Sequence, residues 1–330
     1  MTIHHLVISG GGPSGFLTYG AASYLAKKGF WALADIKSIY GCSIGAYLGV
    51  VFSLGYEWDW LDDYFIKRPW EKVILNSTVH LVDIYKQKGL INDTFFIEGI
   101  KPLLTAKDIS VDITLAEFYA LNHIELHFYT IDINAEQLEK IDVSYKTYPS
   151  LSLIKALQMT MSVPIIFHPV CAADTQSCFV DGGFLNNFPL NDCIEQQQCD
   201  HEEILAFKNI WSNHRDVINE KSSIMDFLLI LMKKLISALS TENKQIEIKN
   251  TVQCAMDGLD SFEVWIEALT NKELRLKAVE QGYKAAEDFL EWGTPPPRPP
   301  VLGDFAPQAP PLGNSAPASQ PPSCGKTLPP

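Results

Sequence analysis

The sequence has little basic charge, few cysteines and no uninterrupted apolar run long enough to span a membrane. Its 330 residues contain 26 Lys and Arg against 39 Asp and Glu, which gives a formal net charge of -13. Nucleic-acid binding needs clustered cations that displace counterions, so we expect no nucleic-acid partner. The same acidity weakens attraction to anionic membranes, so contact with lipid must depend on apolar insertion or on a recruiting partner.

The seven cysteines are odd in number, and no two of them form a CxxC pair. We therefore expect reduced thiols and not a disulfide framework. The amino terminus reaches a glycine cluster without a basic region, which argues against a signal peptide. The most apolar stretch, residues 224–239, carries three charged residues and is shorter than a bilayer span. These features predict a cytoplasmic protein with peripheral membrane contact and no transmembrane helix.

Proline is concentrated at the end of the chain, where residues 294–330 hold 13 of the 20 prolines. Proline removes backbone donors and favours polyproline II, and the few apolar residues here cannot offset the entropy of ordering. We expect one folded domain over residues 1–293 and a disordered proline-rich tail over residues 294–330. The tail is a candidate ligand for a proline-recognising module, although a solvated tail is the simpler interpretation.

Before the tail, short β-branched runs alternate with helical patterns, which is typical of an α/β sheet layered with helices. A strand at residues 3–9 leads through a glycine loop into a helix ending near residue 28. A strand at residues 35–40 leads through a second glycine loop into a helix ending near residue 55. Further strands are expected at residues 125–133, near 170 and 179, and at 204–207, with helices at 93–104, 115–120, 151–159, 223–239 and 271–292.

The second glycine loop, Gly41-Cys42-Ser43-Ile44-Gly45, has the GxSxG pattern of a nucleophile elbow. Side chains at the two glycine positions would collide with the neighbouring strand and helix, and the helix N-terminus favours developing negative charge. The pattern alone is common, but its place between a strand and a helix favours Ser43 as a nucleophile.

The first glycine loop contains three successive glycines, Gly10, Gly11 and Gly12, whose spacing also fits a dinucleotide-binding turn. That turn needs an acidic residue at a strand end about 20 residues later, and the one candidate, Asp35, precedes its strand. We therefore favour an oxyanion hole made by backbone amides. Because Pro13 has no N–H, the expected donors are Gly11 and Gly12, with Gly10 as a third candidate.

A third cluster, Asp181-Gly182-Gly183, follows a predicted strand. Such a tripeptide is a common turn. A carboxylate at a strand end is nevertheless well placed to accept a proton from a serine, so Asp181 is a candidate base.

These pieces, in this order, resemble the patatin-like phospholipase family over about residues 6–189, including Met161-Ser162-Val163-Pro164 and Asn187. The resemblance implies a three-layer α/β/α sandwich with a central, mostly parallel sheet. It also implies metal-independent and cofactor-independent hydrolysis of acyl esters in lipids by a Ser-Asp dyad. By this resemblance Ser43 is the nucleophile, Asp181 the general base, and Gly10, Gly11 and Gly12 the oxyanion loop. Many members carry Arg or Lys where this chain has Ser14, so no basic side chain serves the loop there.

The sequence leaves three alternatives open. A Ser-His-Asp triad would use His168, His201 or His214, although the last two lie in polar surroundings typical of surface histidines. A lipid-binding module without turnover, or one latent until a partner binds, is the alternative of another class. Finally, the helix at residues 224–239 is predicted to be a core helix, with docking on a lipid surface as the functional alternative.

Overall fold

The structure is a computed structural model that describes residues 2–78, 81–172, 174–210, 217–220, 222–242, 246–255 and 262–293. All of these residues fall in one compact unit. The predicted proline-rich tail, residues 294–330, lies outside the described residues. None of the described helices combines the length and the apolarity needed to cross a bilayer.

The described residues form a sheet in which five adjacent strands run parallel and three more pair antiparallel. The parallel strands are, in spatial order, β10 (Thr251–Ala255), β9 (Ile204–Ile210), β1 (His5–Ile8), β2 (Ser38–Cys42) and β4 (Glu125–Asp132). The antiparallel strands are β5 (Lys140–Val143), β8 (Ser177–Asp181) and β7 (Val170–Ala172). A separate pair joins β3 (Gly89–Ile91) to β6 (Ile165–Phe167). The prediction of a mostly parallel sheet is confirmed.

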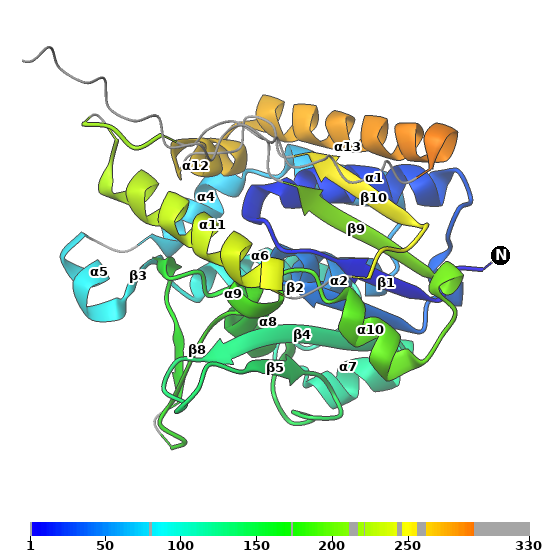
Figure 1. The fold of residues 1–330 in the computed structure, drawn as a ribbon. Helices are drawn as coiled ribbons and strands as arrows, with labels where there is room; N and C mark the ends of the chain where they lie inside the picture. Colours follow the sequence, from blue (N-terminus) through cyan, green and yellow to red (C-terminus); the bar gives the residue numbers. More distant parts are fainter. Residues whose placement is uncertain are drawn as a thin grey trace, which may run out of the picture. The chain divides into compact units, whose positions relative to one another are not determined.

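Side chains on β1 alternate between two hydrophobic cores, because successive residues of a strand face opposite sides. Leu6 and Ile8 join the larger core, to which α1 (Gly15–Lys27), α2 (Ile44–Ser53), α8 (Leu153–Met161) and α13 (Lys272–Trp292) contribute. Val7 joins the smaller core on the other face, with Leu190 and Cys193 of α10 (Leu190–Gln197). Helices therefore cover both faces of the sheet, and the predicted three-layer α/β/α sandwich is confirmed (Figure 1).

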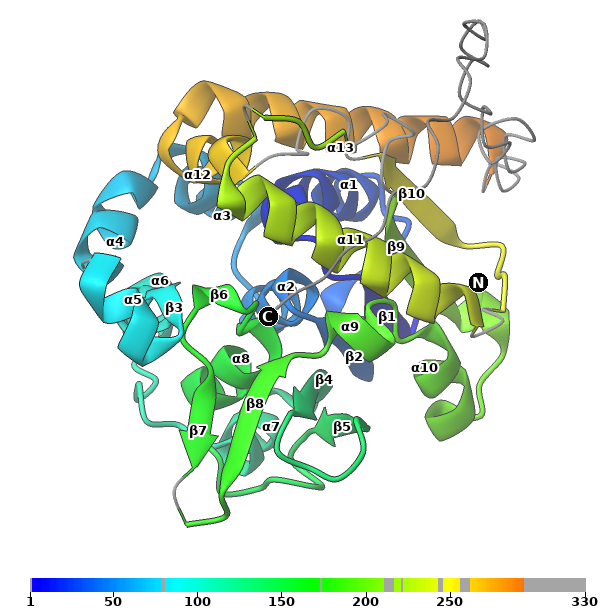
Figure 2. The same cartoon turned by 60° about the vertical axis from the view of Figure 1, so that its left-hand side comes forward.

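The longest described helix, α13, lies alongside α1 (Figures 1 and 2). The backbones approach so closely that a Cβ atom on Gly282 would lie 2.0 Å from the carbonyl oxygen of Leu17. Figure 2 also shows α11 (Ile224–Glu242) crossing between α12 (Phe262–Thr270) and α9 (Gly183–Asn186). The other α-helices are α3 (Trp58–Asp62), α4 (Trp70–Ser77), α5 (Leu81–Gln87), α6 (Thr94–Thr105) and α7 (Leu115–Asn122).

Several predicted boundaries are displaced by two or three residues. The strand predicted at residues 35–40 begins only at Ser38, because Asp35 ends a short 3-10 turn in which its N–H donates to the carbonyl oxygen of Ala32. The helix predicted from residue 151 begins at Leu153, because the Ser152 side chain accepts from the N–H of Lys155 and caps it.

The prediction that residues 224–239 form a core helix is wrong. Among the described side chains of α11, only that of Leu229 is buried. Ile224, Phe227, Leu231 and Leu235 are each at least 43% exposed. The sequence makes two faces of this helix apolar, and only one of these faces packs against the rest of the chain.

Candidate active site

Ser43 lies in the turn between β2 and α2, with φ 53° and ψ -124°. Side-chain-bearing residues rarely adopt this backbone conformation, and such strain is common at functional sites. The Ser43 N–H donates to Thr160 Oγ1 over 3.0 Å, which fixes the turn. A Cβ atom on Gly45 would lie 2.2 Å from the carbonyl oxygen of Ile8, so the glycine is required by close packing. The strand, turn and helix expected for a nucleophile elbow are all present.

Asp181 ends β8, and only 4% of the residue is exposed. Its Oδ1 atom accepts from the Gly183 N–H over 2.8 Å and lies 3.8 Å from Cys42 Sγ. Burial raises the pKa of Asp181 to about 6, although the Ser43 hydroxyl, the Gly183 amide and the Cys42 thiol each lower it. A carboxyl with a pKa near 6 is a better match for a general base at neutral pH than an ordinary aspartate.

Ser43 and Asp181 line the same pocket. The buried Oδ2 atom of Asp181 has no hydrogen-bond partner among the described residues. The Ser43 hydroxyl is nevertheless close enough to lower the pKa of Asp181 as a hydrogen-bond donor. Both observations fit a long or poorly aligned hydrogen bond, which catalytic pairs often show before substrate binds. The structure therefore brings the two sequence-predicted residues together.

The glycine loop passes beside this pair, but its three glycines are not equivalent. The N–H of Gly10 donates to the carbonyl oxygen of Asn187 over 3.0 Å, and a Cβ atom on Gly10 would lie 2.4 Å from Asn187 Oδ1. Gly10 therefore shapes the loop, and its N–H is engaged by Asn187 in this structure; the oxyanion role of the three glycines stays a prediction. Gly11 and Gly12 line a pocket together with Ser43 and Asp181.

The dinucleotide-binding alternative finds no support in the arrangement of the loop. The glycines follow the carboxyl end of β1, whereas Asp35 is exposed and precedes the amino end of β2. Because β1 and β2 are parallel, these ends lie at opposite edges of the sheet. Asp35 is thus not placed to bind a ribose held at the glycine loop.

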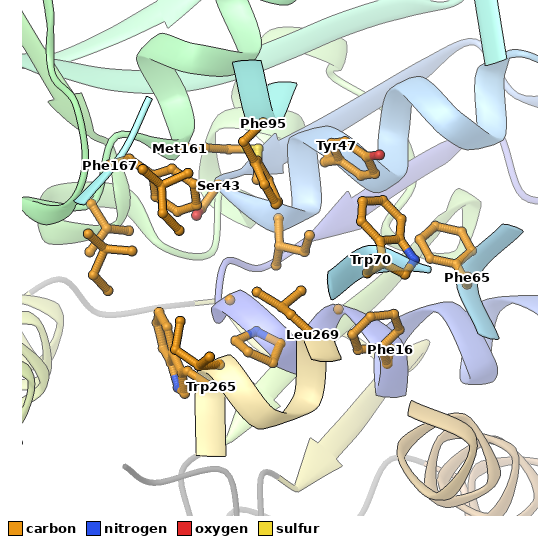
Figure 3. Close-up of a pocket in the computed structure, with 18 residues that line it drawn as sticks. Phe16, Ser43, Tyr47, Phe65, Trp70, Phe95, Met161, Phe167, Trp265 and Leu269 are labelled. Atoms are coloured by element: carbon orange, nitrogen blue, oxygen red, sulfur yellow. The ribbon is translucent and has the colours of Figure 1, made fainter. Parts of the chain in front are cut away.

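An apolar pocket of about 830 Å³, counting its open mouth, begins at Ser43 (Figure 3). Apart from Ser43, its lining is almost wholly aromatic and aliphatic. The labelled lining residues in Figure 3 include Phe16, Phe65, Trp70, Phe95, Phe167 and Leu269. We call this space the apolar pocket; its chemistry suits a hydrocarbon chain.

A second space of about 630 Å³, here called the α11 pocket, is lined by Asp181, Asn187 and Lys233 among other residues. Leu229, Met232 and Ile236 of α11 also line it. The two pockets share four lining residues: Gly12, Ser43, Val163 and Trp265. Ser43 therefore lies where the apolar pocket meets a space with charged and amide groups.

The described histidines do not assemble a triad with Ser43. His201 lies in a 3-10 turn before β9, at the amino edge of the sheet, whereas Ser43 follows the carboxyl end of β2. His168 lines neither pocket. His214 lies outside the described residues.

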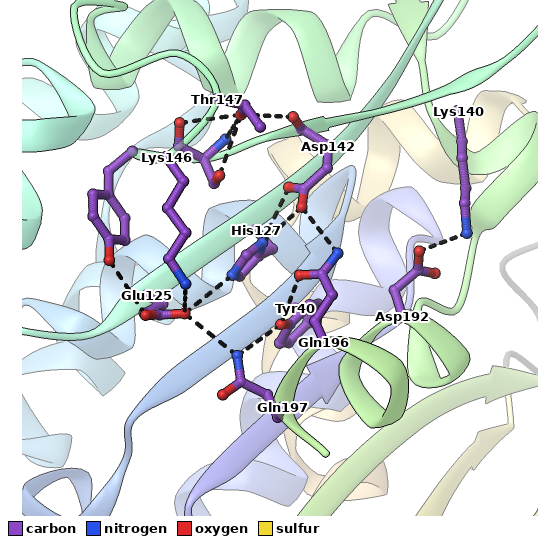
Figure 4. Close-up of polar contacts among 12 residues, drawn as sticks. Tyr40, Glu125, His127, Lys140, Asp142, Lys146, Thr147, Asp192, Gln196 and Gln197 are labelled. Atoms are coloured by element: carbon purple, nitrogen blue, oxygen red, sulfur yellow. Dashed lines mark hydrogen bonds and ion pairs between the residues drawn. The ribbon is translucent and has the colours of Figure 1, made fainter. Parts of the chain in front are cut away.

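Another histidine, His127, sits in a separate polar network (Figure 4). Its Nδ1 atom lies 2.8 Å from Asp142 Oδ2, and its ring stacks on Tyr40 with centroids 4.3 Å apart. Burial alone would lower the pKa of His127, but its interactions with Asp142 and Glu125 raise it above the ordinary value. Gln196 of α10 also donates to Asp142, so the network ties α10 to the sheet. None of these residues lines either pocket, and we assign the network a structural role.

Sequence reasoning missed two residues of the site. Thr160, whose hydroxyl accepts the Ser43 N–H, comes directly before the Met161-Ser162-Val163-Pro164 segment, and this neighbouring segment is the only sequence signal for it. Trp265 comes from α12, and a Cβ atom on Gly12 would lie 2.8 Å from its ring. No sequence motif marks Trp265, because its place depends on tertiary packing.

A family model and two curated relatives are similar to this chain in sequence. A sequence model described as "Patatin-like phospholipase" matches residues 6–194. The "Probable lipid hydrolase 463L" of Invertebrate iridescent virus 6 is 23% identical over 219 residues, which cover 65% of this chain and 73% of the viral protein. The mouse (Mus musculus) "Patatin-like phospholipase domain-containing protein 7" is 24% identical over 185 residues, 56% of this chain but 12% of the mouse protein.

Two solved structures align with lower similarity. VipD from Legionella pneumophila gives a TM-score of 0.46 at 16% identity, covering 86% of this chain and 67% of VipD. The ExoU–SpcU complex from Pseudomonas aeruginosa gives a TM-score of 0.38 at 14% identity, covering 86% of this chain and 52% of the other. The family match spans more than half of the sequence and includes all three predicted motifs. This chain therefore belongs to the patatin-like phospholipase family, and that membership supports lipid hydrolase activity.

Proposed function

We propose that this chain hydrolyses acyl ester bonds of lipids, with Ser43 as nucleophile and Asp181 as general base. The observation that carries the proposal is the position of Ser43 at the meeting point of two unlike pockets, next to a buried carboxyl. An acyl chain fits the apolar pocket, and the more polar part of a lipid fits the α11 pocket.

In the proposed reaction, Asp181 takes the Ser43 proton as the hydroxyl oxygen attacks the ester carbonyl carbon. The amides of Gly11 and Gly12 donate to the oxyanion, and the dipole of α2 favours its negative charge. The intermediate then releases the alcohol, which takes the proton from Asp181, and leaves an acyl-enzyme. Water attacks the acyl carbonyl with Asp181 again as base, which releases the fatty acid and restores Ser43. These steps need no metal and no organic cofactor.

We also propose that α11 contacts a lipid surface. Its exposed apolar residues, Ile224, Phe227, Leu231 and Leu235, recur every three or four positions and so form one stripe. Its opposite face lines the α11 pocket. A helix that covers the pocket with one face and presents apolar side chains on the other suits peripheral contact in the plane of a membrane. We propose a cytoplasmic protein that meets lipid through this stripe.

Substitution of the stripe separates docking from chemistry. Phe227→Asp and Leu231→Asp should lower sedimentation with phosphatidylcholine vesicles at least tenfold and leave hydrolysis of a water-soluble short-chain ester unchanged. Lys101→Gln, at an exposed position of α6 away from the stripe, is the control and should keep vesicle binding. Unchanged vesicle binding by both aspartate variants would reject docking through α11.

The alternative function is a lipid-binding module that is inactive or latent until a partner binds. A fluorophosphonate probe distinguishes the two, because it labels only an activated serine. We expect labelling of the wild-type chain and none of Ser43→Ala. The released acids from a mixed lipid panel would then identify the substrate class. A folded wild-type chain that neither reacts with the probe nor releases acid would support the alternative.

A further inference from the structure

Three side chains with metal-binding atoms converge at the amino edge of the sheet, away from the candidate active site. His5, Cys199 and Glu203 each offer one such atom, and these atoms all lie within 4.8 Å of one another. The three residues come from two regions of the chain about 200 positions apart. Their spacing in the sequence therefore gives no sign of a site.

The backbone holds these residues in place. His5 begins β1 and is in register with Ser38 of β2 and with Ile204 of β9. Glu203 directly precedes Ile204, and its carbonyl oxygen accepts from the N–H of His4 over 2.8 Å. Cys199 lies in the short connection between α10 and β9. Residues anchored on adjacent strands keep their relative positions better than residues on free loops.

The hydrogen bonds around the cluster also fit a metal site. The His5 side chain is buried, and its Nδ1 atom lies 2.8 Å from Ser38 Oγ. A metal-bound imidazole usually has its other ring nitrogen held in this way, so Nε2 is the nitrogen left for a cation. Cys199 and Glu203 are both only half-buried, so a cation can reach their ligand atoms from solvent.

We propose that His5, Cys199 and Glu203 bind one zinc ion, with a water molecule as fourth ligand. Zinc accepts this mixed set of nitrogen, sulfur and oxygen donors, and three protein ligands leave an exchangeable position. The ion would link the start of β1 to the connection between α10 and β9. It would stabilise that edge of the sheet without acting on the ester. His5 is in register with Ser38, five residues before Ser43, which places the two sites about 16 Å apart along the strands.

The test uses the full chain without an affinity tag, stripped of metal by a chelator and then titrated with zinc chloride. Calorimetry should show one zinc ion per chain, with release of protons. At a free zinc concentration 100-fold above Kd, the melting temperature should rise by about 4–5 °C. Cys199→Ser and Glu203→Gln should each weaken binding at least tenfold. Their matched controls, Cys171→Ser and Glu202→Gln, should bind like the wild-type chain.

Cobalt gives a readout that a purely structural change would not produce. The Co²⁺-loaded wild-type chain should show a near-ultraviolet thiolate-to-cobalt absorption band, and Cys199→Ser should lack it. Absence of zinc binding at micromolar concentration would overturn the proposal. So would unchanged binding by both ligand variants, or a cobalt–thiolate band that survives in Cys199→Ser. Ser43-dependent hydrolysis of a soluble ester should be the same in all these variants, so the outcome is independent of the proposed function.

Discussion

Replacing Asp181 with Asn should abolish turnover and at the same time stabilise the folded chain. The residue is 4% exposed and its pKa is raised, by burial first, to about 6 from an ordinary value of 3.8. In the folded chain the buried carboxylate is therefore less stable relative to its protonated form than it is in the unfolded chain. Asn keeps the shape and the acceptor for the Gly183 N–H but carries no charge.

The size and the sign of the effect follow from the two pKa values. Between pH 3.8 and about 6 the folded chain binds the Asp181 proton more strongly than the unfolded chain does. Stability contributed by this group is therefore greatest at low pH and falls as pH rises through the window. Above pH 6 the full difference applies, which is about 3 kcal/mol at about 1.36 kcal/mol per pKa unit. Asp181→Asn should recover it and raise the melting temperature at pH 8 by about 5 °C.

The assay is thermal unfolding of both chains from pH 4 to pH 8, combined with hydrolysis of a water-soluble ester. The stability difference should shrink toward zero as pH approaches 4. Ser43→Ala is the control, because it should lose turnover equally without this pH-dependent gain. An Asp181→Asn chain that is no more stable at pH 8, or whose difference from the wild-type chain is constant across the range, would refute the reasoning. Substantial turnover by Asp181→Asn would refute its role as base.

Four further predictions concern the site and its surroundings. For the wild-type chain, kcat/KM on a soluble ester should fall as pH drops below about 6, because protonated Asp181 cannot accept a proton; a flat profile from pH 5 to 8 would contradict this. Gly45→Ala should give inactive or insoluble protein, whereas Gly49→Ala in the same helix should express and retain activity, because its Cβ atom would meet only the Ile39 side chain at 3.0 Å. His201→Ala should keep at least half of the wild-type turnover. A loss as large as that of Ser43→Ala would support the Ser-His-Asp triad instead of the dyad. EDTA should leave kcat unchanged even if it lowers the melting temperature, and activity restored by added zinc or calcium would show a metal in the chemistry.

The fold was predictable where the sequence pattern is local. A short apolar strand followed by glycines and an apolar helix predicts the units that carry Gly10 and Ser43, because strand, turn and helix signals agree there. Boundaries were less predictable where a side chain decides them, as when Ser152 caps α8. The strand β10 was missed, since its five residues carry no distinctive pattern and gain their place from pairing with β9.

For the candidate site, the sequence predicted the positions of Ser43 and Asp181 but not the hydrogen bonds around them. The engagement of the Gly10 N–H by Asn187 depends on a contact across 177 positions, which no motif encodes. The exposure of one apolar face of α11 was not predicted, for a related reason. Helical periodicity showed that the helix is apolar on more than one face, but only packing decides which face is covered.

The residues that match the family include the proposed catalytic residues but not the helices that complete the two pockets. Ser43, Asp181 and the glycine loop all lie within residues 6–194, which match the family. The α11 pocket, however, is closed by Leu229, Met232 and other residues of α11, and Trp265 of α12 borders both pockets. These helices lie outside the matched region. The proposed chemistry is thus carried by the part of the chain shared with the family. The space that would receive the lipid is completed by a part that the family pattern does not specify, so substrate preference cannot be transferred from relatives along with the catalytic residues.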